Sequence, residues 1–138
     1  MSWRRGLFWL VHLSWGAAQT LVGALTCLFC IRCNHAWYHG AFVTYWNRRD
    51  SASIGPFVFI GRARPSLQKK ILVHEFGHCV QSLMLGPLFL PLVGLPSSLW
   101  ATVFHRRSRR NYYSFLPERS ANRLGRRVTG EEPPDGTE

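Results

Sequence analysis

Two long uncharged segments constrain this chain more than any other feature of its sequence. No lysine, arginine, aspartate or glutamate occurs from Gly6 to Ile31, and none occurs from Cys79 to Phe104. Each segment is long enough for the roughly 20 residues that a transmembrane helix needs. The chain has 138 residues, 46% hydrophobic and only 17% charged, so one water-exposed domain would have few polar residues to cover both segments. The sequence therefore predicts an integral membrane protein.

Basic residues bracket the two uncharged segments. The net charge is +10, with 17 lysines and arginines against 7 acidic residues. This placement is typical of contact with the anionic headgroups of a lipid bilayer, and no nucleic-acid-binding motif accompanies it, so nucleic acid is not an expected partner. The bracketing arginines are Arg4, Arg5, Arg32, Arg106, Arg107, Arg109 and Arg110.

The order of apolar, β-prone and proline-rich stretches predicts a mainly α-helical membrane protein with a small β-hairpin, built as one domain over residues 1–124. The expected elements are a transmembrane helix at 7–31, a β-hairpin at 41–60, a helix at 66–85, a broken apolar segment at 86–104, a short helical segment at 111–124 and a disordered tail at 125–138.

The segment 86–104 allows two topologies. Pro87, Pro91 and Pro96 argue against one straight helix, so the segment either re-enters the membrane and returns to its own side or crosses it as a second span. With a single span at 7–31, 15 of the 17 basic residues follow that span. The positive-inside tendency then places the rest of the chain on the cytoplasmic side of a bacterial cytoplasmic membrane.

The motif His74-Glu75-Phe76-Gly77-His78 is the H-E-x-x-H pattern. On a helix its two imidazoles lie on one face about one turn apart, where both can bind one zinc ion, and the glutamate between them can accept a proton from water. The alternative needs no metal: the same motif fits a helix that carries two surface histidines and in which Glu75 pairs with Lys69 or Lys70.

Scarce acidic residues suggest a third zinc ligand. Between Met1 and Gly130 the only acidic residues are Asp50, Glu75 and Glu118. Glu118 is therefore the only acidic residue between His78 and the tail that we expect to be disordered. Zinc sites with two histidines need a third protein ligand, often a glutamate on a later helix. The alternative is that Glu118 pairs on the surface with Arg119 or Arg123.

The stretch HEFGHCVQSLMLGPLFLPLVGLPS resembles a group of small bacterial membrane proteins with a zincin-like H-E-x-G-H helix. The later NYYSFLPERSANRLG is similar to their tyrosine-rich segment, and QTLVG and SIGPFVFIG also look similar, so the resemblance covers roughly residues 7–125. It implies His74, His78 and Glu118 as zinc ligands and Glu75 as general base. Asn122 departs from the pattern, because many glutamate-type zincins have aspartate there.

These features together favour a membrane-embedded zinc metallopeptidase that hydrolyses a peptide or protein substrate with a zinc-activated water. Two other functions fit the same sequence. The zinc site can instead hold helices together without catalysis, as in a scaffold or pseudoenzyme, or the chain can be a small subunit whose apolar segments pack against a larger membrane partner.

Overall fold

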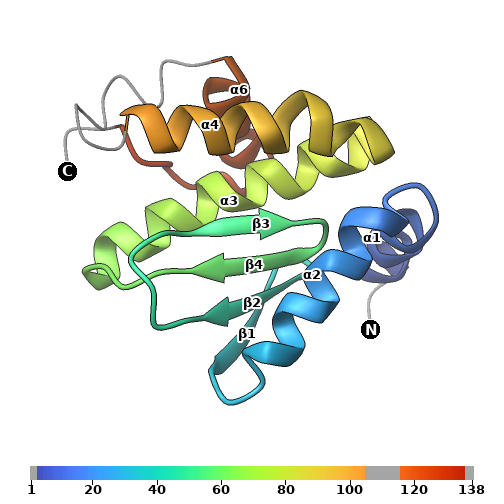
Figure 1. Ribbon diagram of the computed structural model, residues 1–138, viewed down its shortest axis with the longest axis horizontal. Coiled ribbons are helices and arrows are strands. Elements are labelled where there is room, and N and C mark those ends of the chain that lie inside the picture. Colours follow the sequence, from blue (N-terminus) through green and yellow to red (C-terminus); the bar gives the residue numbers. More distant parts are fainter. Residues whose placement is uncertain (1–2, 105–115, 136–138) are drawn as a thin grey trace.

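The chain forms an α/β fold in which helices cover a four-stranded mixed sheet (Figure 1). A computed structural model describes residues 3–104 and 116–135. The helices are α1 (Trp3–Ser14), α2 (Ala17–Phe29), α3 (Pro65–Leu85), α4 (Leu95–Phe104) and α6 (Leu116–Thr129), with a 3-10 turn η1 (Gly86–Leu88) and a π-helical turn η2 (Leu90–Gly94) between α3 and α4. The strands are β1 (Asn34–Tyr38), β2 (Ala41–Tyr45), β3 (Ala52–Ile54) and β4 (Phe57–Ile60).

The expected β-hairpin over 41–60 is wrong in its pairing. The strand order is β1-β2-β4-β3, and β2 runs parallel to β4, with Val43 opposite Val58. The antiparallel pairs are β1 with β2 and β3 with β4. The connection from β2 to β4 carries β3, which turns back into β4 at Gly55, where φ is +63°. Glycine suits this turn because it adopts positive φ without steric cost.

The core lies between one face of the sheet and helix α3. Ala41 and Val43 of β2 and Val58 and Ile60 of β4 alternate with residues of the opposite face, as side chains on a strand must. They pack against three buried side chains of α3, which are Leu72, Phe76 and Cys79. Helix α3 is therefore fixed along the sheet with the H-E-x-x-H residues in its buried middle.

The predicted transmembrane helix at 7–31 is wrong, because the segment folds as two short helices. The amide nitrogens of Trp15 and Gly16 both donate to the Val11 carbonyl, and the Thr20 hydroxyl donates to the carbonyl oxygens of His12 and Gly16. These contacts end α1 and start α2. In the described ranges no helix is long and apolar enough to cross a membrane, so the expected membrane fold and integral-membrane localisation are both corrected.

Residues 86–104 form two short turns and one short helix in place of the expected span or re-entrant hairpin, and their prolines do break the segment. Gly86 has φ +53°, and a side chain there would overlap the indole of Trp15. The chain then passes through η1 and η2 into α4, which lies above α3 in Figure 1 and contacts α6.

The C-terminal boundary also differs from the sequence prediction. Helix α6 continues through Thr129, into the segment expected to be disordered from residue 125. Beyond it the Tyr38 hydroxyl donates to Glu131 at 3.0 Å. The part of the 111–124 segment before Leu116 lies outside the described residues.

Two glycines allow α3 and α6 to approach closely. A methyl group added at Gly77 would overlap the backbone carbonyl of Ala121 on α6, and one added at Gly125 would overlap the carbonyl of Val73 on α3. The obstructing atoms belong to the backbone, so neither helix can relieve the overlap by rotating a side chain. This contact brings the first turn of α6, with Glu118, over the middle of α3.

We expect Gly77→Ala to lower the free energy of unfolding by about 1–3 kcal/mol, because the added methyl group forces the two helices apart. The matched control is Gly6→Ala in α1, where no heavy atom lies within 4 Å of an added Cβ. Alanine should be neutral or stabilising there, since it is the better helix former. Denaturant unfolding measures both variants. Equal stability of the two would contradict the close contact between α3 and α6.

Candidate metal centre

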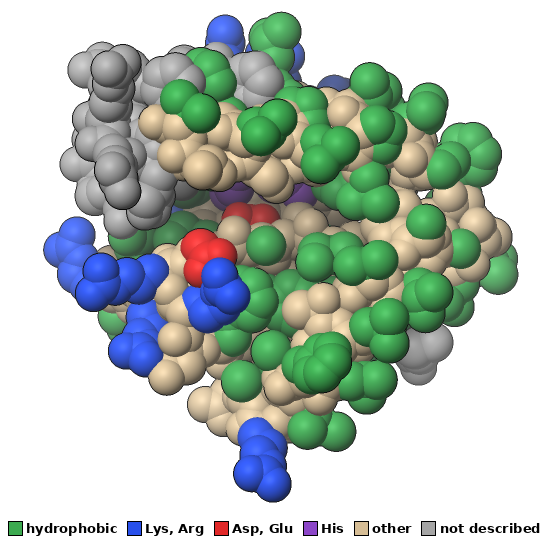
Figure 2. Space-filling model, in the orientation of Figure 1, with side chains coloured by type: hydrophobic (Ala, Val, Ile, Leu, Met, Phe, Trp, Pro, Cys, Tyr) green, Lys and Arg blue, Asp and Glu red, His purple; other side chains and the backbone are tan. Residues whose placement is uncertain are grey.

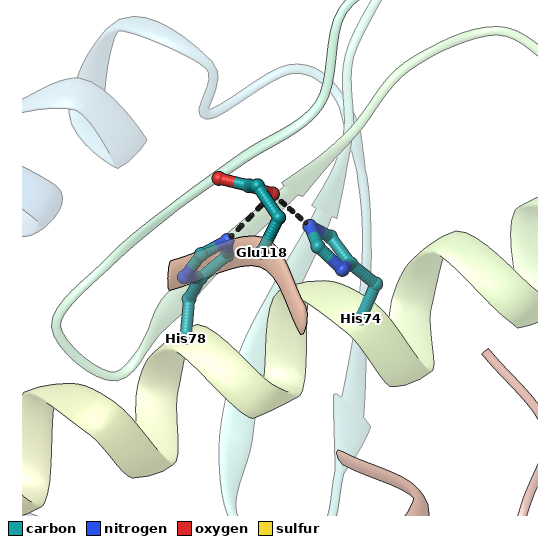
Figure 3. A group of neighbouring side chains, drawn as sticks. All are labelled: His74, His78 and Glu118. Atoms are coloured by element: carbon teal, nitrogen blue, oxygen red, sulfur yellow. Dashed lines mark ion pairs between the residues drawn. The ribbon is translucent and has the colours of Figure 1, made fainter. Parts of the chain in front are cut away.

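Three side chains from two helices form a group that could hold a metal ion. His74 and His78 project from one face of α3, and Glu118 projects from the first turn of α6 (Figure 3). One ligand atom from each lies within 4.8 Å of the other two. The group is nearly closed to solvent, with relative exposures of 2% for His74, 7% for His78 and 0% for Glu118.

The two imidazoles converge on one carboxylate oxygen. The Oε2 atom of Glu118 lies 2.9 Å from Nε2 of His74 and 3.4 Å from Nε2 of His78. Bond lengths of about 2.0–2.2 Å place the ligand atoms of a tetrahedral zinc ion about 3.3–3.6 Å apart. The two separations from Glu118 Oε2 are near this value, and all three ligand atoms lie within 4.8 Å of one another.

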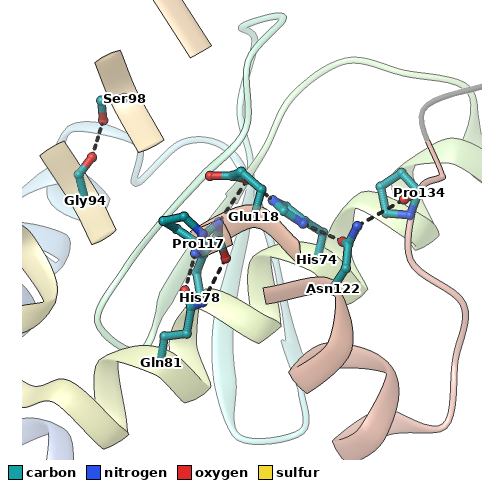
Figure 4. Close-up of polar contacts among 9 residues, drawn as sticks. All are labelled: His74, His78, Gln81, Gly94, Ser98, Pro117, Glu118, Asn122 and Pro134. Atoms are coloured by element: carbon teal, nitrogen blue, oxygen red, sulfur yellow. Dashed lines mark hydrogen bonds and ion pairs between the residues drawn. The ribbon is translucent and has the colours of Figure 1, made fainter. Parts of the chain in front are cut away.

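Two amide side chains fix the orientation of the imidazoles (Figure 4). His74 Nδ1 lies 2.6 Å from Asn122 Oδ1, and His78 Nδ1 lies 2.7 Å from Gln81 Oε1. The amide nitrogen of Gln81 donates to the Pro117 carbonyl at 2.9 Å, and that of Asn122 donates to a carbonyl near the C-terminus at 3.2 Å. Each amide therefore presents its oxygen to the ring, and each ring must donate from Nδ1.

These hydrogen bonds determine which form of each imidazole nitrogen faces Glu118. When Nδ1 of a neutral imidazole donates, its Nε2 carries a lone pair. The lone pairs of His74 and His78 thus point at a carboxylate oxygen, and three electron-rich atoms face one another inside the protein. One proton can bridge only one imidazole to Glu118 at a time, whereas one metal ion can bind all three atoms. The residues present therefore fit a divalent metal.

The pKa shifts of Glu118 and His78 indicate which charge the group favours. Burial alone raises the pKa of Glu118, but the neighbouring imidazoles of His74 and His78 favour its ionised form more strongly and hold that pKa well below its usual range. Burial lowers the pKa of His78, but Glu118 outweighs it and the net pKa is raised. The site thus keeps Glu118 ionised and attracts positive charge.

Glu75 lies between the two histidines in the sequence but outside the metal-holding group. Its side chain is buried, with a relative exposure of 7%. Burial raises its pKa, and the nearby histidines oppose that shift. A buried carboxylate with a raised pKa is better able to accept a proton at neutral pH than an exposed one.

The surroundings of the group offer space on two sides. Figure 2 shows histidine and acidic side chains recessed in a furrow below α4. An apolar pocket of about 340 Å³ adjoins the group at the contact between α3 and α6. Its lining includes Gln81 and Pro117, which are joined by a hydrogen bond. Met84, Leu92 and Leu116 also line the pocket.

All three members of the group were predicted from the sequence, but the two amide side chains that orient the imidazoles were not. Gln81 gave a signal, because it shares a helix face with His78 three residues away. Asn122 stood out only as a departure from the aspartate of the resembled pattern, and here its amide oxygen accepts from His74. Among the described residues, Cys27, Cys30 and Cys33 do not form a metal-holding group.

Comparison of the chain with protein-family models, curated proteins and solved structures finds no match. The structure supports the zincin-like resemblance only in the buried group itself, with two histidines one turn apart on a long helix and a glutamate opposite them.

We expect Asn122→Leu to weaken zinc affinity by about 10–100-fold, because His74 loses the acceptor that keeps its Nε2 lone pair directed at the metal. Asn122→Asp retains an acceptor and should stay within a few-fold of wild type. Competition titration with a chromophoric chelator measures both affinities. Equal affinities of the leucine variant and the wild type would show that Asn122 does not orient the ligand.

Proposed function

We propose that this protein is a zinc-dependent hydrolase that cleaves peptide bonds. The convergence of two imidazole lone pairs and one ionised carboxylate in a buried group supports this proposal most strongly. His74, His78 and Glu118 would hold the ion, and three protein ligands leave one position of a tetrahedral zinc open, as hydrolytic zinc sites require. Bound there, zinc would polarise a carbonyl group and lower the pKa of water.

The residues of the chain would divide the remaining tasks of hydrolysis. Glu75 would accept a proton from the attacking water and deliver it to the amine that leaves when the peptide bond breaks. Asn122 and Gln81 would hold the imidazoles in one tautomer throughout. Burial of the group would strengthen each of these electrostatic interactions, because little water screens them.

Two features favour a peptide as substrate. Strand β3 is an edge of the sheet and packs against α3, which carries the histidines (Figure 1). An edge strand can pair with an extended peptide through backbone hydrogen bonds, which holds the peptide in one register. The apolar pocket beside Gln81 and Pro117 can accept a hydrophobic side chain of such a peptide.

A structural zinc site is the second candidate. The fully buried Glu118 joins α6 to α3, so a metal there would staple the two helices even without turnover. The two functions differ in Glu75. A staple needs only the three ligands, whereas hydrolysis also needs a base.

We expect Glu75→Gln to keep the zinc content of the wild type and to lower peptidase activity by about 10²–10⁴-fold, because glutamine cannot accept the proton. Zinc content is measured by mass spectrometry of the purified protein, and activity with a mixture of quenched-fluorescent peptides. Glu132→Gln is the matched control, since Glu132 pairs with Arg126 at the surface. It should retain both properties.

The variant His78→Ala tests whether the protein has a metal site at all, which both candidate functions require. This variant should lose zinc and, with it, any activity. Bound zinc without activity in the wild type, and unchanged zinc in Glu75→Gln, would establish the staple and reject the hydrolase. Equal, near-zero zinc in wild type and His78→Ala would reject both.

A further inference from the structure

Helices α1 and α2 have inverted polarity. The buried side chains of these two helices are polar or absent, being His12, Gln19, Thr20 and Gly23. Most of their large exposed apolar side chains are aliphatic, and among them Leu10 is 63% exposed and Leu21 is 62% exposed. A helix of a globular protein usually shows the opposite arrangement, with its apolar stripe facing the core.

The inward polar side chains have a structural role. The Gln19 amide donates to the Ser82 hydroxyl at 3.1 Å and to the Gly86 carbonyl at 2.7 Å, and the Thr20 hydroxyl donates to two carbonyls of its own segment. Gly23 lies against the carbonyl of Ile54 and the ring of Phe57. Hydrogen bonds and close packing therefore attach α2 to the rest of the fold and leave its leucines outside.

The second uncharged segment also carries exposed apolar side chains. Turn η1 contacts α2, and α4 presents Leu95, Leu99 and Val103 outward with exposures of 63–66%. Figure 2 shows hydrophobic side chains gathered over α1, α2 and α4, with lysines and arginines mostly elsewhere. Monomeric proteins rarely expose a contiguous apolar patch larger than a few hundred Å². We name the exposed large apolar side chains of residues 3–29 and of α4 the leucine face, which consists of Trp3, Leu7, Leu10, Leu13, Trp15, Leu21, Val22, Leu25, Leu28, Phe29, Leu95, Leu99 and Val103.

The charges around the leucine face indicate what covers it. Arg4 and Arg5 at the start of α1 and Arg32 just after α2 are exposed at its ends. Burial lowers the pKa of His12 to about 4, so this histidine in the last turn of α1 is uncharged at neutral pH. A protein interface has a polar or charged rim and an aromatic-rich core. Here the surface is mainly aliphatic with arginines at its ends, which matches acyl chains below anionic headgroups.

From this pattern we infer that the leucine face docks on an anionic lipid bilayer, with its leucines in the acyl region of the near leaflet and Arg4, Arg5 and Arg32 at the phosphates. No helix crosses the bilayer in this arrangement. Helix α2 has 13 residues and is about 20 Å long, which is less than the roughly 30 Å hydrocarbon core. Trp3 and Trp15 are 72% and 55% exposed at this face, and tryptophan favours the interface between headgroups and acyl chains.

Flotation of the purified full chain with lipid vesicles tests this docking. The chain should float with phosphatidylglycerol vesicles and bind phosphatidylcholine vesicles less tightly. The double variant Leu21→Asn/Leu25→Asn should bind phosphatidylglycerol vesicles at least about tenfold more weakly, because two leucines no longer leave water. Val128→Asn is the matched control, since Val128 is 50% exposed but lies on α6, outside the leucine face, and it should bind as wild type does.

The charge arm uses Arg4→Gln/Arg5→Gln, which should weaken binding to phosphatidylglycerol vesicles by about fivefold per arginine and leave binding to phosphatidylcholine vesicles unchanged. Circular dichroism and zinc binding verify that each variant folds, and Leu28→Asn replaces the double variant if that one does not. Wild-type protein that stays with the buffer fraction would overturn the proposal. Equal binding of wild type and the leucine variant would also overturn it, as would a wild-type dimer that ignores vesicles and that the leucine substitutions dissociate.

Discussion

The structure depends on one unfavourable contact, in which two imidazole lone pairs and a carboxylate oxygen meet inside the protein. Glu118 is fully buried, and its Oε2 atom lies within 3.4 Å of Nε2 of both His74 and His78. Burying an ionised carboxylate is costly unless it is paired. A cation at the centre of the group would remove that cost, and the surrounding contacts of α3 and α6 keep the three atoms directed at one another.

Backbone contacts between α3 and α6 position the amide side chains, and the amides in turn orient the imidazole rings. Gly77 and Gly125 let α6 lie against α3, which places Glu118 over the histidines. Carbonyls near the start and beyond the end of α6 then orient the amides of Gln81 and Asn122, and the amides select one tautomer of each imidazole. Helix α6 therefore supplies both a charged group at the centre and part of the hydrogen bonding that directs the histidines toward it.

How much of this could be read from the sequence follows from which interactions are local. The pairing of His74 with His78 needs only helical geometry, and the scarcity of acids singles out Glu118, although its role as a metal ligand stays a prediction. The parallel pairing of β2 with β4 joins strands that are separated by β3, and no local pattern specifies it. Gln81 was visible by its spacing from His78, but its bond to Pro117 depends on the contact between two helices.

The membrane-spanning prediction failed for a physical reason. Hydropathy sums the apolar residues of a segment, but it does not register that the contacts around Gly16 end one helix and begin another, or that Gly86 and the prolines after it divide the second segment. The residues of these uncharged segments instead form short helices, and polar side chains such as Gln19 point inward. The apolar residues that suggested a span are the ones left on the surface.

X-ray absorption spectroscopy at the zinc edge of the zinc-loaded protein tests the central claim most directly, because it reports the atoms around the metal without requiring a substrate. Two imidazole nitrogens and one or two oxygens at about 2.0–2.2 Å, with the multiple-scattering pattern of imidazole, are the predicted shell. Sulfur at about 2.3 Å would instead place the metal on the cysteines. Such a spectrum, or one without imidazole, would contradict a centre built from His74, His78 and Glu118.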